Sequence, residues 1–535
     1  MDITRESSTT IAMGSRDHAG RAAAVSVLFG VAEAVGVARP APPGLADLNL
    51  DDVISALAAS RPEYDIEAQY LSPLPDRAAV EYRHDVFRDL ERPEVEAAVR
   101  AFSDRVEAVR RRVQSASKAQ HGIRWQQRCW YADAISAYGR AATELTRLLA
   151  DAPLQSAGLI AVRDHLTRYV GSPEFVAMVT RTRDVLDDLQ SISFGLRIRG
   201  GKVTVSRQAD EAVDYSDEVA RVFDRFRHSA PPDGPRARAT IDDPGLNHVE
   251  AQVVDRVALL WPEQFGALTA LCATYPSFVD PTVDRFQREA QFYLAYLDYI
   301  APVRRAGQSF CYPRVLTEER RCEVEESFDL ALAHKLAGQG GGVVTNDIQL
   351  ADDERILVVT GPNHGGKTTF ARMVGQVHHL AAVGVPVPGR TAALPLVDEV
   401  FTHFERAENL DDNRGKLEDD LRRLHQVIHA ATSRSVVILN EVFTSTSLSD
   451  ARTMGTKILE ELTDRDILAV YVTFVDELAS LNASTVSLVS QVRDDDPSQR
   501  TFKVVRQPAN GIAYAVALAS RYGLARDQLR ERITP

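Results

Sequence analysis

Cysteine is scarce in this chain, which has only four in 535 residues. The four are far apart and none belongs to a C-x-x-C pair: Cys129, Cys272, Cys311 and Cys322. That spacing argues against a disulfide framework and against a zinc site, both of which need grouped cysteines. It favours buried, reduced thiols, and we therefore expect a cytoplasmic location.

Long apolar runs are also missing. The nearest candidate, Ala22–Ala32, is stopped by Glu33 and falls short of the ~18–20 residues that span a bilayer. We therefore expect no membrane contact. Residues 1–18 are interpreted as a polar tail, followed by an N-terminal helix that packs on the body of the protein.

Positive charge is in deficit. The 62 Lys and Arg residues are outnumbered by 75 Asp and Glu, which gives a formal net charge of −13. This balance argues against an unspecific grip on nucleic acid over the whole surface. A local basic patch remains compatible with it.

What the chain does contain is a Gly-rich stretch behind an apolar run, Ile356–Val359. The pattern G-x-x-x-x-G-K-[ST] is met by Gly361, Gly366, Lys367 and Thr368. Glycines let backbone N–H groups curl around a phosphate, and the helix N-terminus that follows adds partial positive charge. A Gly-rich turn alone is often only a turn, but the preceding strand and following helix favour nucleotide binding. The predicted ATP-binding residues are Gly361, Pro362, Asn363, His364, Gly365, Gly366, Lys367, Thr368 and Thr369.

The side chains of two loop residues suit the binding of phosphate and of Mg²⁺. We expect the Lys367 ammonium to reach the outer phosphates and the Thr368 hydroxyl to hold Mg²⁺. Downstream, Ser435–Leu439 predicts a buried parallel strand that ends at Asn440 and Glu441. An acidic residue there can reach the γ-phosphate, so Glu441 is predicted to polarise the attacking water. Asn440 stands where a Mg²⁺-holding Asp is usual, and its amide adds no charge.

The region before residue 305 is mostly helical in pattern. After a linker at Pro40–Gly44, apolar residues recur at helical spacing. The Arg-rich run Arg105–Arg112 is interpreted as a solvated helix face rather than a nucleic-acid contact. The aromatic residues of the last stretch indicate a helix buried against several neighbours. The predicted helical stretches are Leu48–Ala59, Glu81–Val113, Ala134–Leu149, Ala157–Gln190 with a break at Gly171–Pro173, Tyr215–His228, Leu246–Tyr275 and Pro281–Arg305, with another, Ile512–Ile533, at the far end.

Ser193–Arg207 interrupts the helices with a two-residue alternation, which predicts a β-hairpin that turns at Gly200 and Gly201. One face is apolar and includes Phe194, Leu196 and Ile198. The other is basic and carries Arg197, Arg199 and Lys202. Such a basic hairpin could contact DNA phosphates, but charges are equally normal on the wet face of a hairpin.

The motifs resemble those of the MutS mismatch-repair ATPases, which are relatives of the ABC-type ATPases. TGPNHGGKTTF is similar to that family's phosphate loop, TGPNMGGKST, with His364 in place of Met. The stretch Phe401–Gly415 resembles its signature segment, and Gly511–Ala519 its closing motif. Thr446, Ser447 and Asp450 resemble the segment after the catalytic Glu. The similarity is most specific over Val358–Leu524.

The resemblance implies an α+β multidomain protein. Residues 1–45 would form a tail and helix, and residues 46–305 a helical core and lever domain. The hairpin near 192–207 would be a reduced DNA clamp, and residues 306–535 an α/β P-loop ATPase domain of ABC type. ATP and Mg²⁺ are the implied cofactors. A homodimer is implied too, in which the signature segment, including Gly415, completes the partner's site.

Several departures from the family pattern matter. Too little chain precedes the helical core for mismatch-reading and connector domains, and no nuclease-like domain follows, so we expect a shortened member. Leu417 replaces the signature serine, Asn440 the metal-holding Asp, and Phe474 the switch histidine. Removing a hydrogen bond to a charged group costs ~1.5–3 kcal/mol. Where such a bond would have stabilised the transition state, its absence slows turnover roughly 10- to 100-fold.

We therefore expect an ATPase that binds ATP, hydrolyses it slowly, and acts as a dimeric switch on branched or otherwise non-standard DNA in repair or recombination. We expect no mismatch recognition of the family's ordinary kind. The alternative is an ATP-gated protein-interaction switch without DNA binding. A metabolic kinase would leave the long helical half unexplained. The sequence identifies neither the DNA structure, nor the partner, nor the residues that contact adenine.

Overall fold

The structure is a computed structural model that describes residues 25–30, 42, 44–118, 123–200, 202–207, 246–405, 416–444, 446–493, 499–509 and 530. The chain forms two compact units. Of the described residues, residue 25 and those within 91–154 and 159–287 belong to the first unit. Those within 26–90, 155–158 and 288–535 belong to the second. The domain boundaries predicted at residues 45 and 305 remain a prediction.

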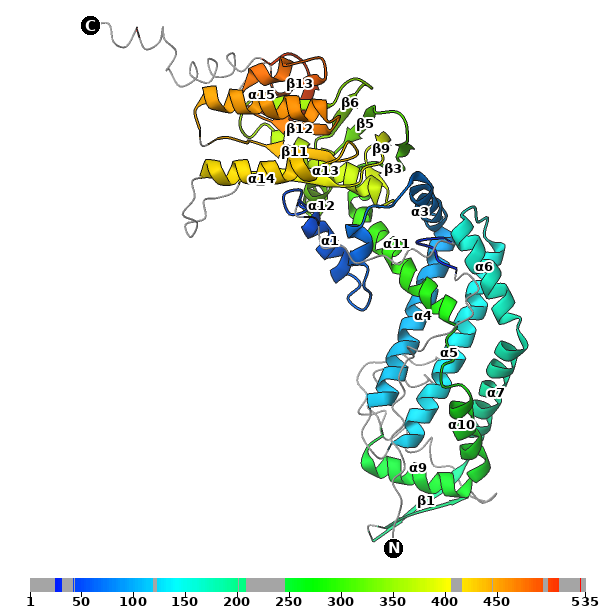
Figure 1. The fold of residues 1–535 in the computed structure, drawn as a ribbon. Helices are drawn as coiled ribbons and strands as arrows, with labels where there is room; N and C mark the ends of the chain where they lie inside the picture. Colours follow the sequence, from blue (N-terminus) through cyan, green and yellow to red (C-terminus); the bar gives the residue numbers. More distant parts are fainter. Residues whose placement is uncertain are drawn as a thin grey trace. The chain divides into compact units, whose positions relative to one another are not determined.

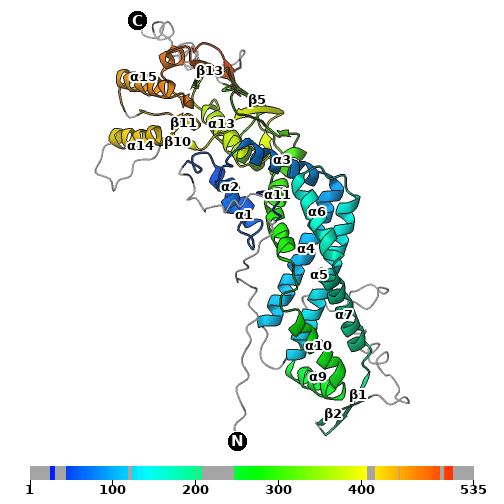
Figure 2. The same ribbon diagram turned by 45° about the vertical axis from the view of Figure 1, so that its right-hand side comes forward.

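The first unit is helical. Its helices α4 (Pro93–Lys118) and α5 (Arg124–Asp151) lie side by side along most of their length (Figures 1 and 2). The apolar side chains of α4 recur every three or four residues and are buried, among them Val95, Val99 and Phe102. The unit also contains most of α6 (Ala157–Val170), α7 (Pro173–Gln190), α9 (His248–Leu260), α10 (Pro262–Thr274) and the first residues of α11 (Pro281–Arg305).

Proline divides two stretches that periodicity predicted as single helices. Glu81–Val113 is instead α3 (Arg77–Leu90) followed by α4, which begins at Pro93. Leu246–Tyr275 is α9 followed by α10, which begins at Pro262. Proline has no N–H to donate and restricts the residue before it, so each ring starts a new helix. The predicted break at Gly171–Pro173 is confirmed.

The predicted N-terminal helix stays a prediction, because the structure describes only residues 25–30, 42, 44 and 45 of that segment; Val27–Gly30 form a turn. The Ser26 hydroxyl accepts hydrogen bonds from the amides of Leu28 (3.2 Å) and Phe29 (3.0 Å). The Glu289 carboxylate accepts another from the Val27 amide at 2.7 Å. The helix predicted at Tyr215–His228 lies outside the described residues, as does Ile512–Ile533 apart from Arg530.

The predicted hairpin is confirmed. Strands β1 (Phe194–Arg199) and β2 (Lys202–Arg207) pair antiparallel, with Arg199 opposite Lys202 at the turn. At its base, Val205 packs into a cluster that includes Trp125, Leu189, Ile192 and Trp261. The guanidinium of Arg207 donates to the Leu260 carbonyl and lies 5.3 Å from the centre of the Trp261 ring. The base of the hairpin is therefore anchored to the helices of its unit.

The second unit contains the main sheet, whose strand order is β10-β11-β12-β7-β13-β14. The first five strands are parallel and β14 runs antiparallel. Helices α13 (Lys367–Ala382), α14 (Lys416–Ala430) and α15 (Leu448–Asp464) connect strands of this sheet. The strands are β7 (Ile356–Thr360), β10 (Val400–Phe404), β11 (Val436–Asn440), β12 (Leu468–Val472), β13 (Thr485–Val492) and β14 (Arg500–Arg506).

A smaller sheet of order β4-β9-β5-β6 belongs to the same unit. Helix α12 (Leu330–Ala337) connects β5 to β6 in sequence. The members of this sheet and of the short β3–β8 pair are β3 (Phe310–Cys311), β4 (Arg314–Leu316), β5 (Cys322–Ser327), β6 (Asn346–Leu350), β8 (Val387–Pro388) and β9 (Thr391–Pro395). Long helices together with two mixed sheets confirm the predicted α+β fold class.

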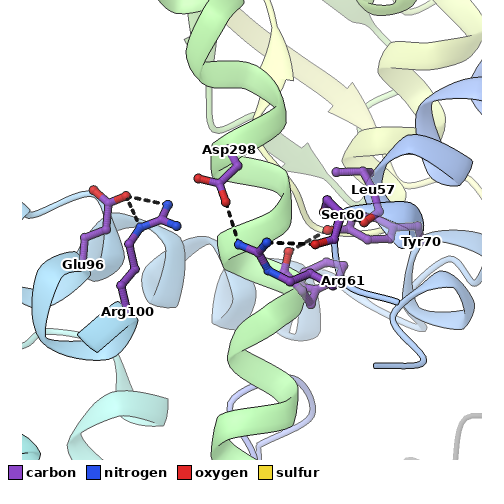
Figure 3. A network of polar contacts seen from close by, with 8 residues as sticks. Leu57, Ser60, Arg61, Tyr70, Glu96, Arg100 and Asp298 are labelled. Carbon is purple, nitrogen blue, oxygen red and sulfur yellow. Dashed lines mark hydrogen bonds and ion pairs between the residues drawn. The ribbon is translucent and has the colours of Figure 1, made fainter. Parts of the chain in front are cut away.

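Helices α1 (Leu50–Ala59) and α2 (Glu67–Leu71) pack on the second half of α11 (Figure 3). The Arg61 guanidinium pairs with Asp298 of α11 at 2.7 Å. The Tyr70 hydroxyl donates to the Phe292 carbonyl at 2.6 Å, and the two rings stack 4.5 Å apart. The predicted burial of the aromatic helix α11 is confirmed. Among the helices described, none is long and apolar enough to cross a membrane.

Candidate functional site

The Gly-rich loop joins β7 to α13 at the carboxyl end of the sheet. All five residues of β7 are buried, and the strand lies between β12 and β13. Gly361 (φ 115°) leaves the strand and Gly366 (φ 96°) caps α13, both in a conformation that L side chains rarely adopt. The first amides of α13 have no partner within the helix. Loop and helix N-terminus together form an anion-binding arrangement.

A residue from β13, Ser490, shapes this loop. Its hydroxyl donates to the Gly365 carbonyl at 2.6 Å. A Cβ atom on Gly365 would lie 2.2 Å from the Ser490 hydroxyl, and one on Gly361 would lie 3.0 Å from the Ser490 carbonyl oxygen. The close approach of β13 therefore requires glycine at both positions. Sequence reasoning missed Ser490, which is 125 residues away from its partner.

The Lys367 side chain is buried beneath the loop. Its ammonium donates to the carbonyls of Gly361 (2.9 Å) and Pro362 (3.2 Å) and to the Asn363 side-chain oxygen (3.3 Å). It lies 3.9 Å from the Glu441 carboxylate. Burial lowers the pKa of the Lys367 ammonium, an effect that Glu441 opposes. The structure thus brings together the predicted cation and the predicted catalytic carboxylate.

A strained turn positions Glu441 directly after β11. Glu441 (φ 53°) and Phe443 (φ 67°) both have left-handed backbone conformations, which cost about 1–2 kcal/mol per residue for L-amino acids. The Glu441 amide donates to the Val472 carbonyl of β12 at 3.0 Å. This hydrogen bond and the buried Phe443 ring hold the turn, so the Glu441 side chain lines the cavity described below.

Asn440, the last residue of β11, is buried, and its side-chain oxygen accepts no hydrogen bond from any described residue. An unpaired buried acceptor is unfavourable, and it marks a place where a water or ion fits. Oxygen donors are also what Mg²⁺ prefers. Asn440 and the Thr368 hydroxyl both offer oxygen donors of the kind that the predicted Mg²⁺ site needs, with less charge than a carboxylate would give; of the two, Thr368 lines the cavity described below.

A cavity of about 730 Å³ opens over the loop. The loop side is polar and includes Asn363, His364, Lys367, Thr368, Thr369 and Glu441. Apart from Gly342 and Asn346, the rest of the lining is apolar, and we call it the apolar wall: Leu332, Leu336, Val343, Val344 and Phe502. Ligand cavities have this size and this combination of apolar walls with few polar groups. Sequence reasoning missed the apolar wall entirely.

Two devices hold the apolar wall in place. Asp329 caps α12 by accepting from the Leu332 amide at 3.0 Å, which fixes the helix that presents Leu332 and Leu336. Asn346 accepts from the Val504 amide at 2.7 Å and donates to the Phe502 carbonyl at 3.2 Å. Phe502, at φ 59° and about half exposed, is thereby held beside the loop.

Among the described residues, several predicted ones do not line this cavity, including Gly361, Pro362, Gly365 and Asn440. Leu417 of α14 packs against the buried cluster of the main sheet. Phe474 follows β12 and is 48% exposed. Gly415 lies outside the described residues. The basic residues Arg197, Arg199 and Lys202 belong to the first unit.

Comparison with known proteins supports the resemblance seen in the sequence. The family model for MutS domain V matches residues 357–527. The DNA mismatch repair protein MutS of Chlorobaculum tepidum is 24% identical over 364 residues, 63% of this chain and 40% of that protein. Endonuclease MutS2 of Gemmatimonas aurantiaca is 29% identical over 189 residues, 35% of this chain and 23% of that protein.

A shorter match has a higher identity. The DNA mismatch repair protein MutS of Thermotoga neapolitana is 34% identical over 141 residues, 26% of this chain and 18% of that protein. The chain spans less than half the length of each of these relatives. The matches nevertheless agree with one another and with the geometry around the loop, and they support membership of the MutS family.

Proposed function

We propose that this chain is an ATPase that binds ATP with Mg²⁺ and hydrolyses it slowly. One observation carries the proposal: a cavity of about 730 Å³ is lined both by the Gly-rich loop and by the apolar wall. The triphosphate would lie along the loop, and the base would lie against Phe502, Leu332 and Leu336. Each part of the nucleotide thereby meets a surface of matching polarity.

The residues at the loop have distinct roles in this proposal. Backbone N–H groups of the loop, which Pro362 lacks, and the N-terminus of α13 would hold the phosphates. Lys367, whose ammonium donates to the carbonyls of Gly361 and Pro362, would reach the outer phosphates. Thr368 and Asn440 hold Mg²⁺, which neutralises phosphate charge. Glu441, 3.9 Å from Lys367, orients and polarises the attacking water.

Slow hydrolysis is supported by the side chains that replace polar helpers. Asn440 offers a neutral oxygen, Leu417 has no hydroxyl, and Phe474 has no hydrogen-bonding group. Each substitution takes away a charged or polar group that could stabilise the reacting phosphates. Without one such hydrogen bond in the transition state, turnover is roughly 10- to 100-fold slower.

Release of radiolabelled phosphate tests this activity. We expect slow turnover that Lys367→Ala abolishes, because this ammonium lies within the loop and 3.9 Å from Glu441. The matched control is Lys457→Ala, which removes an exposed lysine from α15 and should leave turnover unchanged. Fast turnover, or turnover that survives Lys367→Ala, contradicts the proposal.

We further propose a homodimeric, cytoplasmic switch that acts on branched or otherwise non-standard DNA in repair or recombination. The relatives' names, DNA mismatch repair protein and endonuclease, support a DNA-related role. The basic residues Arg199 and Lys202 of the hairpin are exposed and, with Arg197 on the same strands, suit phosphate contacts. The two ATPase domains would pair so that the segment around Gly415 completes the partner's site.

Gel shifts at varied salt test the DNA part. Phosphate contacts release counterions, so affinity should fall steeply as salt rises. Light scattering with and without ATP tests the dimer. If duplex, branched and single-stranded DNA all fail to bind at low salt, the alternative is favoured, an ATP-gated protein-interaction switch.

A further inference from the structure

The hairpin of the first unit has two chemically different faces. Directly paired residues share a face, so Leu196 lies on the same side as its partner Val205, and Val203 lies there too. The base of this face is covered, because Val205 packs against the buried cluster of Val257, Ala258 and Phe265. The rest is uncovered: Leu196 is 53% and Val203 39% exposed.

The opposite face carries cations. Arg197, Arg199 and Lys202 alternate with the apolar residues along the two strands. None of the three forms an ion pair with another residue in the described part of the chain. Arg207 differs from them, because it is bound to the Leu260 carbonyl and the Trp261 ring. Although the chain has a net charge of −13, these three exposed cations have no ion-pair partner among the described residues and complement an anionic ligand.

We propose that this hairpin binds DNA at unpaired bases. Leu196 and Val203 would cover the faces of the bases, and the three cations would contact phosphates of the adjoining strand. The inference rests on the proposed function, since it takes DNA binding as given and names the DNA structure.

The chemistry of the two faces favours DNA with unpaired bases over a continuous duplex. A continuous duplex stacks its bases and offers mainly phosphates and polar base edges to a protein. Unpaired bases expose flat apolar faces that side chains can cover, which is how wedge residues and single-strand binding surfaces work. A thin two-stranded hairpin inserted at a branch, gap or loop meets bases on one side and phosphates on the other. An acidic protein would satisfy the cations but would not account for the uncovered apolar face.

Competition binding by fluorescence anisotropy tests the inference, using the full chain and two DNAs of equal length. One is a continuous duplex and the other has a central unpaired bubble. We expect the bubble to bind roughly fivefold to tenfold tighter, the effect of partly burying two aliphatic side chains. The double variant Leu196→Thr/Val203→Thr keeps good strand formers in the hairpin and should equalise the two affinities. Leu259→Gln, at a leucine of α9 that is 70% exposed, is the matched control and should preserve the preference.

A second variant separates the two proposals. The triple variant Arg197→Gln/Arg199→Gln/Lys202→Gln should weaken binding to both DNAs alike. If neither DNA binds the wild-type chain at low salt, the proposed DNA function fails and this inference falls with it. If both bind equally, or if Leu196→Thr/Val203→Thr keeps the preference, this inference alone is overturned. It is likewise overturned if that double variant changes only self-association in light scattering, which would assign the apolar face to a second copy of the chain.

Discussion

Replacing Gly365 by alanine tests whether β13 determines the shape of the loop. Gly365 does not have a positive φ, unlike Gly366, so alanine is conformationally allowed there and its effect is purely steric. The added Cβ would lie 2.2 Å from the Ser490 hydroxyl, 3.0 Å from the Pro362 carbonyl oxygen and 3.3 Å from the Ser490 Cβ. Loop and strand cannot both remain in place.

The size of the effect follows from two terms. Forcing an extra methyl group into a packed site costs about 1–3 kcal/mol. Moving Ser490 away also breaks its 2.6 Å hydrogen bond to Gly365, which contributes about 1 kcal/mol. Together these give about 2–4 kcal/mol, or roughly 30- to 1,000-fold weaker ATP binding if the whole cost falls on the loop conformation that binds phosphate.

A second substitution makes the reasoning refutable. Ser490→Ala alone removes only the hydrogen bond and should weaken ATP binding roughly fivefold. In Gly365→Ala/Ser490→Ala the 2.2 Å approach is relieved, so the double variant should recover at least about tenfold of the affinity. Titration with a fluorescent ATP analogue measures affinity, and urea unfolding checks that the fold is intact. A double variant that binds no better than Gly365→Ala refutes the proposed steric role of Ser490.

Three further predictions concern single side chains. Glu441→Gln should lower phosphate release by roughly 100-fold or more while ATP still binds; equal reductions in binding and release would contradict the role of Glu441. Asn440→Asp should strengthen Mg²⁺ dependence and raise turnover roughly tenfold, because it places a carboxylate where an unpaired buried oxygen now lies; unchanged Mg²⁺ titrations of the ATPase would argue against it. Burial lowers the pKa of His378 from 6.5 to about 4, so the unfolded chain takes up a proton near pH 6.5 while the folded chain resists until about pH 4. The contribution of His378 to the free energy of unfolding should therefore be complete above pH 6.5 and should fall by up to about 3 kcal/mol towards pH 4. Urea midpoints of His378→Asn should depend less steeply on pH than those of the wild-type chain. An equal dependence on pH would be evidence that His378 does not cause the loss.

The sequence predicted elements best where a single local pattern controls them. The hairpin Phe194–Arg207 was predicted from alternation and two glycines. The long helices were predicted from apolar spacing, but their ends were not. Periodicity continues across Pro93 and Pro262, whereas the backbone breaks there because proline has no N–H to donate.

The sequence by itself determined the strand, loop and helix around Gly361–Thr369, because glycine conformations and a helix start depend on neighbouring residues. It also placed Glu441 at the end of its strand. Only the tertiary structure decided what surrounds them. Ser490 reaches Gly365 across 125 residues, and the apolar wall combines α12 with Phe502. Parallel strands joined by crossovers bring distant segments to one edge of a sheet, and no local pattern encodes which of them will meet.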